Sequence, residues 1–255
     1  YTFTASVDRT LTALFEVDED YRVTLRTDPA DAGAVTGGGS YEDGNREATV
    51  TATANPGYYF MGWYGDDTLK ESNTSYTFNV PEDGITLTAK FGVDYLYQAE
   101  QAKETFEKAQ GEDSLTWTIL TDAVDAYEAA ESFVSDPPDV IENAETRYAA
   151  LTTYYNSVDT LDLSGQNLGG ADLAELDFFT GVTDLNLSGN RLEDITPLSY
   201  LQNIERLDVS YNDISSELPF MAMYSLESLN LTGNPLTDEQ VELIRKNLPN
   251  CDVIF

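Results

Sequence analysis

The apolar residues of this 255-residue chain follow different spacings in its successive parts. In the first part, apolar and polar residues alternate, most clearly at 23–25, 48–54 and 86–91. A period of two is typical of strands that bury one face. Turn sequences such as TGGGSYEDG, NPG and PEDG separate these runs. The pattern predicts a small all-β module over residues 19–93.

From residue 94 to 156, apolar residues recur every three or four positions, which is the spacing of amphipathic helices. The three stripes are Leu96, Ala99, Ala102, Phe106 and Ala109; Leu120, Ala123, Tyr127, Ala130 and Val134; and Ile141, Ala144, Tyr148, Leu151 and Tyr155. Gly111 separates the first two helices, and we expect Ser114 to cap the second. Asp136 and Pro137 are expected to begin the third. Because the connections are short, the segment is predicted to be an antiparallel three-helix bundle.

Residues 157–255 carry a longer repeat. Four copies, VDTLDLSGQNL, VTDLNLSGNRL, IERLDVSYNDI and LESLNLTGNPL, begin at Val158, Val182, Ile204 and Leu226. They resemble leucine-rich repeats, which implies a short α/β solenoid with one parallel strand per repeat. The strands are expected to bury Leu161/Leu163, Leu185/Leu187, Leu207/Val209 and Leu229/Leu231. The return segments are expected to bury Leu176/Phe179, Leu198/Leu201 and Phe220/Met223.

Each repeat after the first has an asparagine in the turn that follows its strand: Asn190, Asn212 and Asn234. We expect these side chains to point inward and bond backbone groups that the turn leaves unpaired, which is a structural role. The first repeat has Gln166 there, followed by Asn167, so its turn is expected to be distorted.

Terminal repeats need caps. The third helix leads almost directly into Val158, so we expect it to cover the first repeat. At the other end, residues 237–255 are predicted to form a helix capped by Thr237 and then a short strand, with Cys251 packed as a small hydrophobe.

A second, longer period joins the start of the chain to the end of the all-β module. Residues 1–18 (YTFTASVDRTLTALFEVD) share a frame with residues 76–94 (YTFNVPEDGITLTAKFGVD). This spacing is typical of tandem modules, so residues 1–18 are predicted to be the last hairpin of a preceding copy. That hairpin could pack on residues 19–93 or pair with another chain. We therefore expect a piece of a longer protein, with any signal or anchor outside it.

The aromatic stretch NPGYYFMGWYG at residues 55–65 could be a binding platform or a core strand. Strict alternation would place Phe60 and Trp63 on opposite faces. A bulge at Gly62 would bring them together. We therefore predict that Tyr58, Phe60 and Trp63 are core residues, and that Tyr59, Met61 and Tyr64 point outward.

Two segments resemble known modules. Residues 37–44 (GGGSYEDG), 48–64 (ATVTATANPGYYFMGWY) and 76–91 (YTFNVPEDGITLTAKF) resemble the divergent internalin-type B repeat, a tandem stalk module of large bacterial surface proteins. Its better-studied relatives have a β-grasp fold, so the resemblance implies a β-grasp-like module. Residues 114–133 and 142–155 are similar to the FIVAR module, a three-helix unit of Gram-positive surface proteins. A helical spacer that caps the repeats is the alternative for this segment.

Composition narrows the function classes. The net charge is −33 and is spread along the chain, which argues against nucleic acid and anionic membranes as partners. The chain has no histidine and one cysteine, so the common catalytic triads, most zinc sites and intrachain disulfides are excluded. No apolar run reaches the length of a membrane span. We expect no cofactor and no metal.

The strand faces of the repeats carry small polar and acidic groups. The candidate ligand-binding residues there are Asp162, Asp184, Asn186, Arg206, Asp208, Tyr211 and Asn230, with Tyr59 and Tyr64 in the all-β module. Arg206 and Tyr211 are of the types favoured at binding hot spots, and we expect them to lie side by side. A scaffold whose main contacts lie elsewhere is the favoured alternative. Bound Ca²⁺ is disfavoured, because residues spaced 22–24 apart form no compact loop.

The function predicted is a non-enzymatic extracellular segment of a bacterial cell-surface protein, wall-attached or secreted. It would act as a stalk and in adhesion, through a host or bacterial surface protein or a glycan. The alternative is an accessory region of a carbohydrate-active enzyme that binds glycans by exposed aromatics. A catalytic carboxylate pair is disfavoured, because no segment is typical of a barrel or jelly roll large enough to hold a cleft.

Overall fold

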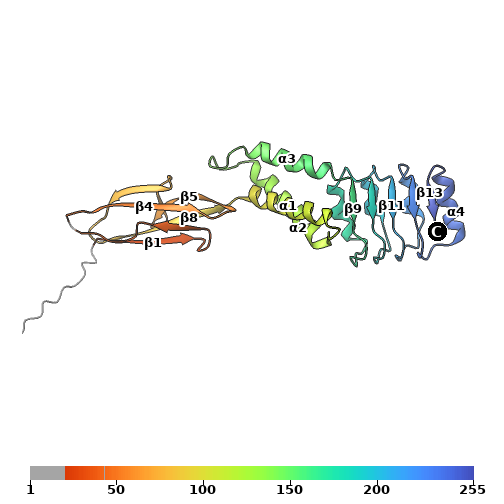
Figure 1. Ribbon diagram of the computed structural model, residues 1–255, viewed down its shortest axis with the longest axis horizontal. Helices are drawn as coiled ribbons and strands as arrows, with labels where there is room; N and C mark the ends of the chain where they lie inside the picture. The colour runs from red at the N-terminus through yellow and green to blue at the C-terminus, as the bar shows by residue number, and fades with distance from the viewer. Residues whose placement is uncertain (1–20, 43) are drawn as a thin grey trace, which may run out of the picture. The chain divides into compact units, whose positions relative to one another are not determined.

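The computed structural model describes residues 21–42 and 44–255, and these residues form two compact units, divided between Val93 and Asp94 (Figure 1). The hairpin predicted for residues 1–18 lies outside the described residues. Residues 94–156 and 157–255, predicted as separate domains, lie in the second unit and share one hydrophobic core.

The first unit contains two β-sheets. The five-stranded sheet has the order β3 (Gly39–Ser40), β1 (Arg22–Asp28), β8 (Ile85–Val93), β5 (Tyr58–Gly65) and β6 (Thr68–Glu71). The three-stranded sheet has the order β2 (Gly33–Thr36), β4 (Glu47–Ala54) and β7 (Ser75–Asn79). The strand pair β1–β8 is parallel, and the other pairs are antiparallel. The described residues of this module form no helix, so an all-β module is confirmed and the β-grasp-like fold is not.

The core of this module forms between the two sheets, around Trp63. Register shifts between Phe60 and Gly62, where Gly62 has a φ of +143°, so the predicted bulge is confirmed. The bulge turns Trp63 inward, where it is fully buried and meets Phe60 edge-to-face at 5.8 Å. Its indole Nε1 donates to the carbonyl of Thr74 at 3.2 Å. Tyr58 and Phe60 are half-buried against the same core, as predicted.

The second unit begins with helices α1 (Tyr95–Gly111), α2 (Trp117–Val134) and α3 (Ala144–Asn156). The cap expected at Ser114 is wrong. Thr116 caps α2 by accepting from the backbone N–H of Ile119, whereas the Ser114 N–H and hydroxyl bond the carbonyl of Ala109 at the end of α1.

The start expected for α3 at Pro137 is also wrong. The helix begins seven residues later, after a turn closed by a hydrogen bond from Ile141 N to the carbonyl of Pro138. The physical reason is the second proline, because the residue before a proline is disfavoured in the helical region. Ile141, expected on the helix stripe, therefore packs against the core from the loop.

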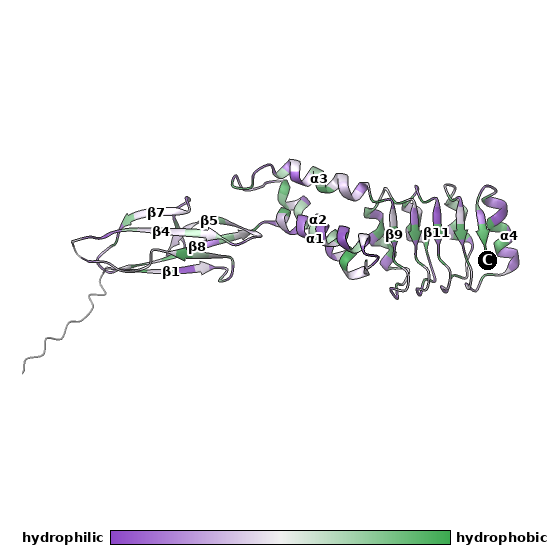
Figure 2. Cartoon of the chain, viewed as in Figure 1, coloured by the Kyte–Doolittle hydropathy of each residue, from purple (hydrophilic) through white to green (hydrophobic). Residues whose placement is uncertain are grey.

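The repeats form a parallel sheet of β9 (Thr160–Asp162), β10 (Asp184–Asn186), β11 (Arg206–Asp208), β12 (Ser228–Asn230) and β13 (Asp252–Ile254). The chain returns through 3₁₀ helices η1 (Asp172–Phe178), η2 (Thr196–Tyr200) and η3 (Leu218–Ala222). All the strand and return residues expected to be buried are buried. Helix α4 (Asp238–Asn247) precedes β13, and it carries both hydrophilic and hydrophobic residues, with Val241 and Ile244 buried (Figure 2). Thr237 and Gln240 form its capping box, so the predicted cap is confirmed.

The buried asparagines have the predicted structural role. The Asn212 side chain donates to the carbonyls of Leu187 and Val209 and accepts from the N–H of Leu192, all near 3.0 Å. The first turn is distorted as expected. Gln166 stays outside the turn and accepts from the N–H of Trp117, while Asn167 adopts a φ of +63°.

The helices cover the first repeat as predicted, with α1 contributing as well as α3. Phe106 of α1 stacks on Phe179 at 5.5 Å, and Tyr155 of α3 meets Phe179 edge-on at 6.1 Å. The amide of Gln110, at the end of α1, donates to the carbonyl of Thr160 in β9 at 2.9 Å. The core therefore continues from the bundle into the solenoid.

Candidate functional site

The strands β9–β12 present the predicted polar column on one face of the sheet, where it lines a shallow groove of about 370 Å³. At the start of the strands, the guanidinium of Arg206 makes a two-pronged ion pair with Asp184 of the neighbouring strand. This hydrogen-bonded pairing raises the pKa of Arg206 above its usual value. Glu205 adds a weaker contact at 3.6 Å. The cation of the column is thus already paired with acids.

The residues at the end of each strand also have a structural role; they are Asp162, Asn186, Asp208 and Asn230. Each side-chain oxygen accepts the backbone N–H two residues further on, at distances of 2.8–3.2 Å. This local bond is the Asx turn, which ends each strand and starts the following bend. In addition, the Asn230 amide donates to Asp208 at 3.0 Å. The column is therefore built from groups that hold the repeat turns, and all four residues line the groove.

Tyr211 lies at the bend after β11. It has a φ of +54°, in the left-handed region, where the matching residues of the other repeats are Gly165, Gly189 and Gly233. Its ring lies over Gly233, where an added Cβ would come within 2.7 Å of the ring. The ring is 67% exposed. The groove is lined by Arg206 but not by Tyr211, and the expectation that the two lie side by side stays a prediction.

Tyr59 and Tyr64 belong to the first unit, where both lie on the outward face of the five-stranded sheet. Tyr59 pairs with Gly92 across β5 and β8, and its ring covers that glycine. The ammonium of Lys90 lies 4.7 Å from the centre of the Tyr64 ring, a cation–π contact. Both rings are half-buried, so they lie along the sheet and do not project from it.

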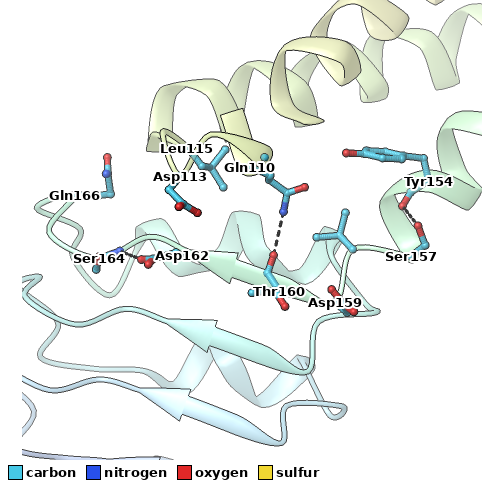
Figure 3. A pocket seen from close by; sticks show the side chains of 12 residues that line it. Gln110, Asp113, Leu115, Tyr154, Ser157, Asp159, Thr160, Asp162, Ser164 and Gln166 are labelled. Carbon is cyan, nitrogen blue, oxygen red and sulfur yellow. Dashed lines mark hydrogen bonds between the residues drawn. The ribbon is translucent and has the colours of Figure 1, made fainter. Parts of the chain in front are cut away.

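A second groove, which the sequence did not predict, lies between the helical cap and strand β9 (Figure 3). Its volume is about 510 Å³. The α1–α2 connection contributes Asp113 and Leu115, the end of α3 contributes Tyr154, and the first repeat contributes Asp159 and Asp162. This edge groove shares Thr160 and Asp162 with the groove over the strands, so the two meet at β9. Only the packing of helices on repeats creates it, and no local sequence signal marks it.

The described residues offer little reactive chemistry. Among residues 21–42 and 44–255, no three carboxylate or cysteine side chains gather as metal ligands would. Burial, with the nearby Asp252, raises the pKa of the Cys251 thiol, which disfavours a nucleophilic thiolate. None of the described helices combines the length and apolar character that crossing a membrane requires.

Comparisons with known proteins agree with the modular organisation. A family model described as "Divergent InlB B-repeat domain" matches residues 23–94, and one described as "Leucine Rich repeat" matches residues 200–217 and 225–244. Both resemblances are confirmed for these segments. The similarity of residues 94–156 to the FIVAR module stays a prediction.

Partial matches among solved structures include bacterial leucine-rich repeat proteins. A leucine-rich repeat protein of Leptospira interrogans is 24% identical over 45% of this chain and 28% of its own, with a TM-score of 0.34. Internalin C2 of Listeria monocytogenes is 24% identical over 42% of this chain and 44% of its own, with a TM-score of 0.33. The internalin InlF of the same organism is 19% identical over 51% of this chain and 35% of its own, with a TM-score of 0.36. The match thus spans less than half the length of each, and no curated protein matches the chain.

Proposed function

We propose that this chain is a non-enzymatic, extracellular segment of a bacterial cell-surface protein, in which the B-type module is a stalk and the repeats bind a partner. The matches to a divergent InlB B-repeat and to leucine-rich repeats support this proposal. Both are binding or spacing modules, and among the described residues no group of side chains gathers as metal ligands would. The partner is a macromolecule on a host or bacterial surface.

Tyr211 is the observation that carries the proposal. A bulky residue in the left-handed region costs about 1–2 kcal/mol, which glycine avoids. Strain of this kind is found at functional sites more often than elsewhere. Exposed tyrosines are also among the residues that contribute most to protein binding. A strained, exposed ring at a position that is glycine in three other repeats is therefore the centre of the proposed binding surface.

Charge indicates the character of the partner surface. Because Arg206 is already paired with Asp184, the charge of the column that is left without an ion pair comes from acids such as Asp162 and Asp208, which line the groove. Complementary charge steers association and suppresses wrong partners. We therefore propose a protein partner that presents basic groups around a pocket for the Tyr211 ring.

The test compares Tyr211→Gly with Tyr224→Ser. Tyr224 is also highly exposed, at 75%, but it follows η3 on the return side of the solenoid. Beads coated with each variant are added to cultured epithelial cells and to bacterial cells, and the retained beads are counted. Tyr211→Gly is expected to lose most retention, and Tyr224→Ser is expected to keep it. Equal retention by both variants would contradict the proposal.

Treating the cells first then identifies the class of partner. Trypsin is expected to remove retention, whereas periodate, which oxidises glycans, is expected to leave it. The Tyr211→Gly variant is also expected to fold at least as stably as the parent, since glycine fits its backbone conformation. Lost binding with unchanged or higher thermal stability would separate a binding role from a folding role.

A glycan-binding function is the second candidate, and it is supported by the position of Tyr59 and Tyr64, which pair with Gly92 and Thr88 on the outward face of the five-stranded sheet. Aromatic faces can stack on sugar rings, but both rings here are half-buried on β8. A glycan array probed with the parent chain and with Tyr59→Ala tests it. A signal that the substitution abolishes would support this function, and equal signals would remove it.

A further inference from the structure

We propose that the edge groove takes an extended cationic peptide segment, which pairs with the free edge of β9 as an added strand. This goes beyond the proposed function, because it does not involve Tyr211 and uses the edge groove, which shares only Thr160 and Asp162 with the groove over the strands. The occupant is defined by chemistry: a main chain that can form a strand, with basic side chains at alternate positions.

The first support is the open edge of the repeat sheet. In the order β13–β12–β11–β10–β9, the last strand has a neighbour on one side only among the described residues. On that side, Leu163 N donates to the carbonyl of Asn186, and the carbonyl of Asp159 accepts from Asp184 N. Because alternate residues of a parallel strand direct their backbone groups to opposite edges, those of Thr160 and Asp162 face the groove. Such an edge is a template for a further strand.

The hydrogen bonds at this edge agree with backbone groups of Thr160 and Asp162 that face the groove. The carbonyl of Thr160 is bonded by a side chain, the amide of Gln110 at 2.9 Å, where an added strand would place its own N–H (Figure 3). Among the described residues, no backbone hydrogen bond outside the strand ladders involves the N–H or carbonyl of Asp162. The edge is thus partly covered by one flexible side chain that a peptide can replace.

The second support is room. Neighbouring strands lie about 4.8 Å apart, so a strand added beside β9 must fit beneath the α1–α2 connection and Tyr154. The volume of about 510 Å³ is in the range of ligand pockets, roughly 300–1,000 Å³. If the helices only protected the edge, they would be expected to pack directly on it and leave no such space.

The third support is charge, which selects the occupant. Asp113, Asp159 and Asp162 line the groove, and the described residues of its lining include no lysine or arginine. Among the residues that the structure describes, none is ion-paired with these three carboxylates. They do not form a metal site, because no metal-ligand group is found among the described residues. Unpaired acids beside an open strand edge favour a peptide with basic side chains.

The test uses the full 255-residue chain and a synthetic heptapeptide of alternating lysine and valine, labelled for fluorescence anisotropy. Two further peptides carry N-methyl groups, one on every lysine and the other on every valine, so that each loses the N–H groups of one edge. An added strand uses the N–H groups of only one edge. We expect one methylated peptide to bind about tenfold more weakly and the other to bind like the parent peptide.

Matched protein variants locate the site. The triple variant Asp113→Asn, Asp159→Asn and Asp162→Asn removes the groove charges, and the amide oxygen introduced by Asp162→Asn can still accept the Ser164 N–H. Its control, Asp136→Asn, Asp139→Asn and Glu142→Gln, removes the same charge from the exposed α2–α3 connection. The groove variant is expected to bind about tenfold more weakly, and the control to bind like the parent chain. In NMR spectra the peptide should shift the amide signals of Thr160 and Asp162.

Several results would overturn the proposal. Equal binding of all three peptides would mean electrostatic adsorption without strand pairing. Equal weakening by both triple variants would place the peptide elsewhere, and no binding at millimolar peptide would exclude this class of occupant. A dimer mass by light scattering that the peptide leaves unchanged would mean that a second copy occupies the edge. None of these results depends on Tyr211, so failure here is distinct from failure of the proposed function.

Discussion

The two-sheet module and the repeat domain stabilise their interiors in different ways. Among the described residues, the buried polar side chains are Asn190, Ser210, Asn212 and Asn234, and all of them lie in the repeats. The sheets of the module pair most of their own backbone groups in ladders, so their core can be apolar around Trp63. A solenoid bends after every three-residue strand, which leaves backbone groups unpaired inside each turn. The comparison teaches that the stability of the two-sheet module depends strongly on one side chain, Trp63. The stability of the repeats is distributed over many similar interactions, one set in each repeat.

Trp63→Ala tests the concentrated core and is expected to have the largest effect. Removing a fully buried tryptophan typically costs about 3–5 kcal/mol, and here it also removes the bond to Thr74. Denaturant titration with hydrogen exchange of peptides from residues 21–93 measures the loss. Met61→Ala is the control, because Met61 is 46% exposed in the same strand. A loss below about 1 kcal/mol for Trp63→Ala would mean that this core is distributed too.

Asn212→Ala tests the distributed interior and is expected to cost about 3 kcal/mol. The substitution leaves the Leu192 N–H and the Leu187 and Val209 carbonyls buried without partners, and each such group costs about 1–3 kcal/mol before relaxation. Asn203→Ala removes one exposed bond, to the carbonyl of Thr180, so its expected cost is under about 1 kcal/mol. Guanidinium titration monitored by circular dichroism compares the two. Equal losses of stability in the two variants would show that the buried asparagine side chains are not what distinguishes the interior of the repeats.

Alkaline pH tests the joint between helices and repeats, where tyrosines cluster. Burial, with a contribution from Glu107, raises the pKa of Tyr154 to about 12, and burial also raises the pKa of Tyr148 and Tyr155. In the unfolded chain these groups lose protons near pH 10. The folded state retains its protons longer, so stability is full below pH 10 and falls as the pH rises toward 12 and beyond.

We expect the melting temperature of the second unit to fall by a few degrees between about pH 9.5 and about 12. Tyr155→Phe is the matched variant, because the Tyr155 hydroxyl is buried without a hydrogen-bond partner among the described residues. It should match the parent chain near neutral pH and lose less stability at high pH. The same pH dependence in both chains would mean that Tyr155 does not contribute.

Local patterns predicted much of this structure. The leucine ladder and the inward asparagines follow from one repeat frame, and the bulge at Gly62 follows from the spacing of Phe60 and Trp63. These features depend on residues a few positions apart, or on a sequence repeat whose period is also the period of the folded structure. The sequence therefore contains the information directly.

The predictions failed or were incomplete where a second local constraint, or contacts between residues far apart in the sequence, determine the structure. Pro138 moved the start of α3 to Ala144, although Asp136 and Pro137 alone resemble a helix start. The polar column was correctly placed, but its Asx turns became visible only with the geometry of the bends. The edge groove needs residues from α1, α3 and the first repeat, up to about 50 positions apart, as in the bond between Gln110 and Thr160. No single segment carries that information.

Thr237→Ala gives the smallest expected effect, but it distinguishes the two architectures by where the effect appears. Losing the capping box of α4 costs about 1 kcal/mol. In a solenoid each repeat contacts only its neighbours, so damage at one end is expected to be local. Hydrogen exchange should therefore quicken in α4 and β13, less in β12, and little in β9. A substitution of the same cost in the two-sheet module, such as Phe60→Leu, should quicken exchange across both of its sheets. Uniform loss along the repeats after Thr237→Ala would show that the solenoid unfolds as one cooperative core.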